Sequence, residues 1–350
     1  MTVLKRNSNL EVLRIIAMCM IILIHFASAA DIANLGVDGK FGRFVGASIV
    51  GICNMGVTCF CLISGYFGMK FSWKKLLKFE IMMIMFSLIE TVVLVVAFPE
   101  QMQGSALLEQ LVKSVFPFVS RKYWFYSCYI CVFLFSGFIQ KLIDTLKKEE
   151  FEKLLALLLI VFSVFPTIFY FEIMQDAGKG LVQMLMLYLI GRYIRLYKDV
   201  PVPKGKALLL FGALWLANTI SIMHPVRLGS IVHSLCRDNS ITNIAMAVIL
   251  LYLFKNMKFS SCLVNAVTAN MFAVFALENT LVQVVAGIVG SGKLNAGNPV
   301  LGMVLLVGII LLIFIVCALV GKVRELLFGK LEDGLIDKVL SVKYNKLDKR

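Results

Sequence analysis

The sequence predicts an all-α integral membrane protein, a polytopic bundle of about ten transmembrane helices. Of its 350 residues, 60% are hydrophobic and only 16% are charged, and the mean hydropathy is +0.88. A water-soluble domain needs more polar side chains than this to cover its surface. The apolar residues also form continuous runs without the alternation of a membrane β-barrel, so helices are the expected spanning elements.

Most of these runs approach the length of about 20 residues that an α-helix needs to cross the hydrocarbon core of a bilayer. The first run, residues 15–30, is expected to be a span, because no small-residue cleavage site and polar mature domain follow it. In chain order, the predicted spans are residues 11–30, 45–68, 79–98, 122–140, 154–172, 180–197, 206–223, 241–254, 263–287 and 299–320.

Lysine and arginine residues predict the orientation. With the N-terminus in the cytoplasm, 25 of the 35 basic residues fall on the inner side and nine on the outer side, and Arg14 lies near a helix start. This bias predicts that both termini are cytoplasmic. Residues 1–322 are expected to form one transmembrane domain, and residues 323–350 a basic cytoplasmic tail. The net charge of +14 suits contact with anionic membrane lipids, and no nucleic acid is expected as a partner.

The nine cysteines lie mostly inside the apolar runs. Cys128 and Cys131 have the spacing of two metal ligands, but no second pair or nearby histidine completes a set of four. We therefore expect small apolar side chains at these positions and no metal site.

The first predicted span carries both an arginine and a histidine. Ser8 and Glu11 predict a capping box that starts the helix near the cytoplasmic face. Arg14 and His25 are eleven residues apart, which brings them within about 20° of one helix face and about 16 Å apart along its axis. Lipid-phosphate contact would explain Arg14, and an interhelical hydrogen bond would explain His25. An ionisable residue inside the membrane is otherwise a candidate functional residue.

Three further stretches carry polar or aromatic side chains. The second span ends with Ser64 and Tyr66 on either side of a glycine, a pattern that also suits close helix packing. Trp124 lies in an aromatic cluster that suits an interfacial belt or stacking on a sugar ring. Glu278 and Asn279 interrupt the ninth span, where a carboxylate must face a polar cavity or a partner. Three lysines follow the second span at the expected depth of Arg14: Lys74, Lys75 and Lys78.

Taken in order, these elements resemble the acyltransferase-3 family of multi-spanning bacterial membrane acyltransferases, close to the branch associated with O-acetylation of surface glycans. The resemblance rests on Arg14 and His25 with ten residues between them, the segment CFCLISGY at 59–66, the basic pattern at 74–78 and YWF at 123–125. It covers nearly the whole chain. Members of this branch often carry a histidine before Glu-Asn in a late helix, where this chain has Leu277, so an inactive homologue stays open.

The resemblance implies an O-acyltransferase of the bacterial inner (cytoplasmic) membrane, which moves an acetyl group from cytosolic acetyl-CoA to a hydroxyl of a surface or lipid-linked glycan. His25 would be a general base or an acyl carrier, with Glu278 as the second catalytic residue. The expected donor site holds acetyl-CoA phosphates and comprises Arg14, Lys74, Lys75 and Lys78. The expected acceptor site comprises Ser64, Tyr66, Trp124 and Asn279.

No tightly bound cofactor is expected besides acetyl-CoA as the donor substrate. A different class of protein stays open, a transporter or flippase for a glycan or lipid-linked precursor, because polar residues in membrane helices also suit a transport pathway. The sequence shows no clear internal repeat of the kind that many transporters have. It leaves the oligomeric state open, a homo-oligomer included.

Overall fold

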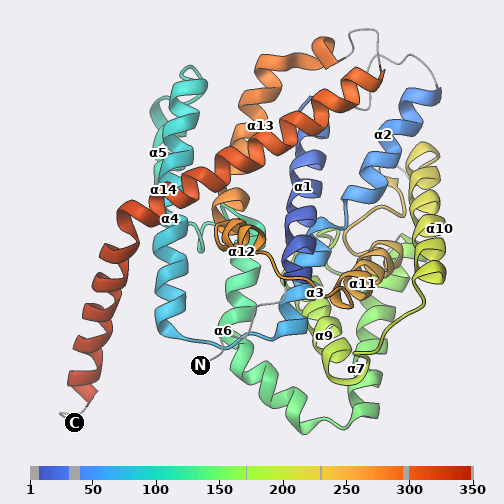
Figure 1. Cartoon of the computed structure of the whole chain (residues 1–350), viewed down its shortest axis with the longest axis horizontal. Coiled ribbons are helices and arrows are strands. Elements are labelled where there is room, and N and C mark those ends of the chain that lie inside the picture. Colours follow the sequence, from blue (N-terminus) through green and yellow to red (C-terminus); the bar gives the residue numbers. More distant parts are fainter. Residues whose placement is uncertain (1–7, 31–39, 171, 229–230, 295–298, 348–350) are drawn as a thin grey trace.

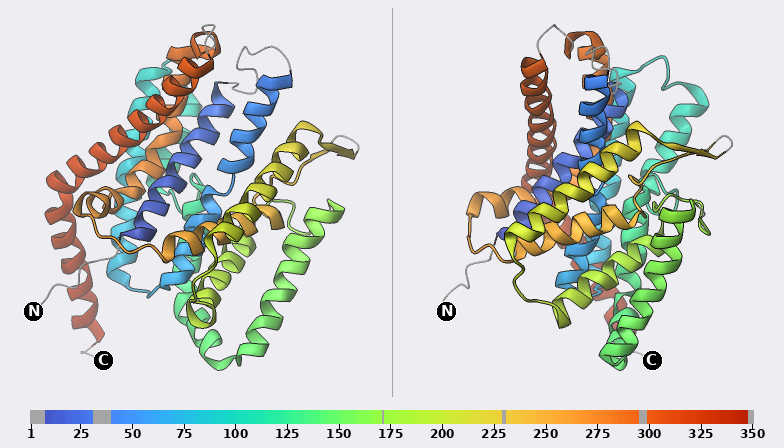
Figure 2. Two further views of the ribbon diagram at one scale, coloured as in Figure 1. Left: turned by 45° about the vertical axis from the view of Figure 1, so that its right-hand side comes forward. Right: turned by 90° about the vertical axis from the view of Figure 1, so that its right-hand side faces the viewer.

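The computed structural model describes residues 8–30, 40–170, 172–228, 231–294 and 299–347. These residues form a bundle of α-helices (Figure 1) with one short antiparallel β hairpin, which projects from its side (Figure 2). The predicted fold class is confirmed. The elements in chain order are α1 Asn9–Ala29, α2 Lys40–Cys53, α3 Gly56–Phe67, α4 Trp73–Ala97, α5 Gly104–Val115, α6 Trp124–Thr145, α7 Lys148–Leu159, a π-helical turn Ile160–Val164, α8 Phe165–Phe169, α9 Leu181–Tyr197, α10 Lys204–Met223, β1 Val226–Leu228, β2 Ile231–His233, α11 Ile241–Lys255, α12 Cys262–Ala269, α13 Met271–Leu294 and α14 Pro299–Leu347.

Among the described residues, eight helical segments are long and apolar enough to cross a membrane, and they lie at eight of the ten predicted spans. The other two predicted spans, 180–197 and 241–254, contain α9 and α11, which have 17 and 15 residues. These helices measure about 26 and 22 Å, less than the ~30 Å thickness of a hydrocarbon core. The placement of both termini in the cytoplasm stays a prediction.

The packing of α10 is the reverse of packing in a soluble protein. Its buried residues are Asn218 and Thr219, whereas Leu208, Leu209 and Leu210 are 56%, 77% and 53% exposed. The amide of Asn218 donates to Asn243 Oδ1 on α11 at 3.2 Å. Outward apolar side chains with polar contacts between helices are typical of a bundle in lipid.

Two of the predicted spans are interrupted. The span predicted at 45–68 is divided into α2 and α3 by a turn at Asn54 and Met55, and the span predicted at 263–287 is divided into α12 and α13 at Asn270. The first break lets the start of α3 press against α1, because a Cβ on Gly56 would lie 2.7 Å from the carbonyl oxygen of Ala17.

α14 is much longer than the predicted tenth span. It has 49 residues and passes through the expected boundary at residues 322–323 without a break. In Figure 1 it crosses the bundle obliquely and then bends toward the chain's C-terminal end. Its second half contacts the start of α4 through two ion pairs, Lys74 with Asp337 and Lys78 with Asp333.

α1 is the central helix, because its side chains belong to both apolar cores of the bundle. Ile22 and Phe26 pack with residues of α4, α13 and α14, and Leu13 packs with residues of α3, α9 and α11. The helix begins where the sequence predicts, but the capping box is wrong. Ser8 is buried against α12 and its hydroxyl donates to Asn265 Oδ1 at 3.0 Å, so it makes no cap contact.

A candidate active site along helix α1

A cavity of about 580 Å³ follows one face of α1. Arg14, His25 and Ser28 of α1 line it, so it extends along this helix from Arg14 to Ser28, about 21 Å. Its other walls come from α2, α3, α4, α6, α12 and α13 and from the loops before α9 and α11. The volume is in the range of pockets that hold small-molecule ligands. The sequence prediction that Arg14 and His25 share one face is confirmed.

His25 is paired with Glu278 of α13 inside this bundle. His25 Nδ1 lies 2.8 Å from Glu278 Oε1. The Glu278 side chain is 2% exposed, whereas 43% of the His25 side chain is exposed, in keeping with its place in the cavity wall. The second oxygen, Glu278 Oε2, is buried without a hydrogen-bond partner in the described part of the chain. Glu278 therefore orients the imidazole from behind, and the other edge of the ring is free to face a ligand.

A second carboxylate ties α13 to α4 close to this pair. Glu90 of α4 accepts a hydrogen bond from Thr280 Oγ1 at 2.9 Å and pairs with Lys122 at 2.8 Å. The hydroxyl of Tyr123 also donates to Glu90. Thr280 lies two residues after Glu278, so these contacts hold the segment of α13 that positions Glu278.

Arg14 is the first residue of α1 that lines the cavity, and two neighbouring side chains fix its position. Its Nη1 donates to both oxygens of Glu11, at 2.9 and 2.8 Å, and its guanidinium lies over the ring of Phe67 at 5.5 Å. Glu11 thus acts on Arg14 instead of completing the expected capping box. Because Nη1 makes both contacts, Nη2 and Nε stay available for an anion in the cavity.

Aromatic side chains of α6 and α13 form another part of the cavity lining. Phe125 is central to it, with ring centroids 6.0 Å from Trp124 and 5.4 Å from Phe275, and Tyr129 lies 5.9 Å from Phe272. All five rings line the cavity, and Ser64 lines it as well. Apolar, flat walls of this kind suit a thin acyl-pantetheine chain or the face of a sugar ring.

Two loops complete the cavity, residues 172–180 before α9 and residues 234–240 before α11. Lys179 of the first loop and Asp238 of the second line the cavity. Asp238 is 7% exposed, and its backbone oxygen accepts a hydrogen bond from Gln183 at 3.0 Å. Within the described residues its carboxylate has no hydrogen bond or ion pair.

Comparison with known families agrees with this geometry. A family model described as an acyltransferase domain, of the acyltransferase-3 type, matches residues 7–321, which is most of the chain. The chain belongs to the acyltransferase-3 family. It is therefore a multi-pass membrane acyltransferase, an enzyme with an acyl donor and an acyl acceptor. No curated protein and no solved structure shows significant similarity to it. The family match ends inside α14, so the second half of that helix lies outside it.

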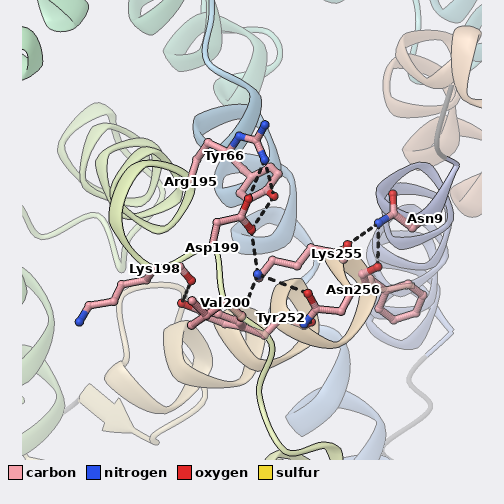
Figure 3. A network of polar contacts seen from close by, with 10 residues as sticks. Asn9, Tyr66, Arg195, Lys198, Asp199, Val200, Tyr252, Lys255 and Asn256 are labelled. Carbon is pink, nitrogen blue, oxygen red and sulfur yellow. Dashed lines mark hydrogen bonds and ion pairs between the residues drawn. The ribbon is translucent and has the colours of Figure 1, made fainter. Parts of the chain in front are cut away.

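In this acyltransferase, Tyr66 does not line the cavity but belongs to a polar network between α3, α9 and α11 (Figure 3). Its hydroxyl donates to Asp199 Oδ1 at 2.9 Å and accepts from Arg195 at 3.0 Å. Lys255 also donates to Asp199, at 2.8 Å. Burial alone would raise the pKa of Asp199, but the hydrogen bonds from Lys255 and Tyr66 hold it below its ordinary value. These contacts fasten three helices together.

The three lysines of α4 are not brought together with Arg14 in the cavity. Lys74 and Lys78 pair with Asp337 and Asp333 of α14, at 2.7 and 2.8 Å. Lys75 is exposed and has no ion pair in the part of the chain that the structure describes. It precedes the cavity residue Phe79 by four positions and therefore lies on the same face of α4, one turn away.

The residues on either side of Glu278 point elsewhere. Asn279 is exposed and does not line the cavity. Leu277, at the position where the resemblance leads one to expect a histidine, is buried in the apolar core with residues of α1 and α14. A leucine there fills the packing and leaves the contact between His25 and Glu278 intact.

Several cavity residues were not predicted from the sequence. The aromatic residues of α6 and α13 other than Trp124 look like ordinary apolar helix residues, although their spacing at four positions, as in Phe125 and Tyr129, puts them on one helix face. Asp238 lies in a polar stretch outside the predicted spans, where a carboxylate looks solvated. Its only sequence signal is a position just before an apolar helix.

Proposed function

We propose that this acyltransferase is an O-acetyltransferase of the bacterial inner membrane, which moves an acetyl group from cytosolic acetyl-CoA to a hydroxyl of a surface or lipid-linked glycan. The observation that carries the proposal is the pair of His25 and Glu278 in the wall of a cavity that also contains Arg14. Arg14 could bind the phosphates at one end of acetyl-CoA, and His25, at a different depth of the same cavity, could act on the thioester at the other end. Family membership favours this reaction over the transporter alternative.

His25 is the general base of the proposed reaction. The Glu278 carboxylate accepts a hydrogen bond from Nδ1–H, which leaves the lone pair of Nε2 on the cavity side. Nε2 takes the proton of a sugar hydroxyl as its oxygen attacks the thioester carbonyl. The tetrahedral intermediate collapses, the C–S bond breaks, and the imidazolium returns the proton to the departing CoA thiolate. The products are the acetyl ester and CoA.

A second route uses the same residues in two steps. Nε2 attacks the thioester carbonyl, the C–S bond breaks, and CoA leaves as the thiolate. The sugar hydroxyl then attacks the acetyl-imidazolium, the acyl–nitrogen bond breaks, and the proton released by the hydroxyl balances the thiolate to give CoA as the thiol. The two routes differ in one observable. Labelled acetyl accumulates on His25 in the absence of acceptor only if the histidine is an acyl carrier.

Arg14 is the donor-side residue of the proposal. Arg14 lines the cavity about 16 Å from His25 along α1, so a phosphate group bound at Arg14 would leave the pantetheine arm to reach His25 along the aromatic side chains. Of the three lysines, Lys75 is best placed to add a second positive charge, because Lys74 and Lys78 are already paired with α14.

The acceptor side of the proposal uses Trp124 and Ser64, which line the cavity. The indole offers a face for stacking on a sugar ring, and the hydroxyl offers a donor and an acceptor. Tyr66 and Asn279 lie outside this cavity, and the proposal assigns no substrate contact to them.

Purified protein tests the proposal through two substitutions of the base. His25→Ala is expected to lower acetyl transfer by about 10²- to 10⁴-fold, the usual cost of losing a general base. The same variant should keep the elution profile and thermal unfolding midpoint of the wild type. Normal acetyl transfer by His25→Ala would show that His25 has only a structural role. A wild-type protein that neither hydrolyses acetyl-CoA nor transfers acetyl groups would instead support an inactive homologue.

A further inference from the structure

The loop that carries Asp238 is built to hold this residue in place. Arg237 donates to the backbone oxygen of Pro166 at 2.5 Å and pairs with Glu172. The amide of Asn243 donates to the backbone oxygen of Arg237 at 2.9 Å. On the other side of the loop, Gly178 has a positive φ of 85°, and a Cβ there would lie 2.4 Å from the backbone nitrogen of Asn239.

In contrast to these neighbours, the side chain of Asp238 makes no hydrogen bond or ion pair with a described residue. The contacts just described involve backbone atoms or the side chains of neighbouring residues, and Gln183 contacts only the backbone oxygen of Asp238. Asp238 as a residue is 7% exposed and lines the cavity, and no described residue donates a hydrogen bond to its carboxylate. A buried carboxylate without partners costs free energy, and in native structures such a group commonly has a functional role.

We propose that Asp238 recognises the acyl acceptor: its carboxylate accepts hydrogen bonds from two neighbouring hydroxyl groups of an uncharged sugar residue whose other hydroxyl is acylated. This inference rests on the proposed function, because it places the acceptor in the cavity of His25. Neither the family match nor the sequence pattern assigns a role to Asp238.

The chemistry of the wall selects this class of ligand. A carboxylate binds hydrogen-bond donors and repels phosphates and carboxylates, so an acidic sugar is disfavoured next to Asp238. Lys179 lies on the same wall without an ion pair to Asp238. A sugar hydroxyl can therefore donate to Asp238 and accept from Lys179. The aromatic rings that line the cavity supply an apolar face for the C–H side of a pyranose.

Steady-state kinetics with soluble probes test the inference. The probes are a methyl hexopyranoside and the matching methyl hexuronoside, which differ in one carboxylate, with acetyl-CoA as the donor. Asp238→Asn should raise the KM for the hexopyranoside by about 10- to 100-fold, the effect of weakening hydrogen bonds to a charged group. It should change the KM for acetyl-CoA by less than two-fold. The wild type should discriminate against the hexuronoside by at least ten-fold, and Asp238→Asn should reduce that ratio.

Asp176→Asn is the matched control. Asp176 lies on the neighbouring loop and does not line this cavity, and the asparagine keeps the oxygen that accepts from the Gly178 N–H at 2.8 Å. This variant should leave the acceptor KM unchanged.

Three results would overturn the inference: an unchanged acceptor KM in Asp238→Asn, an equal rise in the donor KM, or equal use of the two probes by the wild type. The last result needs no variant, so it holds even if Asp238→Asn fails to fold. A wild type that hydrolyses acetyl-CoA but acetylates neither probe also contradicts the acceptor class. A wild type without any acetyl-CoA turnover contradicts the proposed function instead.

Discussion

His25 and Glu278 are 253 positions apart in the chain, and their side chains meet at 2.8 Å between Nδ1 and Oε1. The carboxylate is buried and the imidazole lines the large cavity. This contact joins the first helix to the thirteenth and fixes which ring nitrogen faces the ligand. The proposed reaction depends on this contact.

Glu278→Gln tests that dependence. The amide of glutamine can donate to Nδ1, which would place the ring proton on Nε2 and remove the base from the cavity side. We expect kcat to fall by about 10²- to 10⁴-fold with little change in the KM for acetyl-CoA. Asn279→Ala, one position along the same helix and exposed, should have normal kinetics. Equal activity of Glu278→Gln and the wild type would contradict the assigned tautomer.

The donor site predicts a difference between neighbouring lysines. Arg14→Ala should raise the KM for acetyl-CoA by about ten-fold, as the loss of a charge-assisted contact to phosphate does. Lys75→Ala should raise it by a smaller factor, and Lys74→Ala should not, because Lys74 is paired with Asp337. Higher salt should raise the KM of the wild type more than that of Arg14→Ala. A donor KM that is the same in Arg14→Ala and the wild type would remove this assignment.

Asp238 also predicts a pH-dependent cost in stability. Burial raises the pKa of its carboxyl from 3.8 to about 6, although Lys179 opposes the rise. The folded protein therefore holds this proton more tightly than the unfolded chain, so stability falls as pH rises from about 4 to about 6 and stays lower above that. Two pKa units correspond to roughly 3 kcal/mol.

Asp238→Asn should accordingly have a higher thermal unfolding midpoint than the wild type at pH 7.5, and the two midpoints should converge near pH 4. Differential scanning measurements in one detergent at several pH values check this. A lower midpoint for Asp238→Asn at pH 7.5 would show that the carboxylate stabilises the fold.

The packing of α3 on α9 depends on two glycines. A Cβ on Gly65 would lie 2.0 Å from the backbone oxygen of Tyr188, and one on Gly191 would lie 2.2 Å from the oxygen of Leu62. Gly65→Ala should destabilise the protein by about 1 to 3 kcal/mol or more, because the backbones must separate. Gly212→Ala in α10, where a Cβ meets nothing within 4 Å, is the matched control and should not lower the unfolding midpoint. Equal midpoints for the two variants would contradict the close approach.

Helix geometry explains which parts of the site could be predicted from the sequence. Arg14 and His25 could be placed together because eleven residues return to the same face of a helix. The same rule shows why Ser64 and Tyr66 cannot both face the cavity, since two residues turn the side chain by about 200°. Only Ser64 lines it. The sequence alone does not show which face of α3 lines the cavity and which face packs against other helices.

Other features depend on tertiary contacts that no local pattern reveals. The pairing of Lys74 and Lys78 with α14 required knowing that the predicted tail continues that helix and returns to α4. Asp238 comes from a loop that the sequence leaves outside the membrane and that the fold brings into the cavity wall.

In the proposed reaction, a cytosolic donor and an extracytoplasmic acceptor would meet at His25. Sealed right-side-out vesicles that contain the protein test this arrangement, with radiolabelled acetyl-CoA inside and a membrane-impermeant methyl hexopyranoside outside. Labelled acetyl hexoside is expected in the outer solution with the wild type, and none with His25→Ala. Labelled product that forms only when the hexoside is loaded inside together with acetyl-CoA would contradict transfer across the membrane.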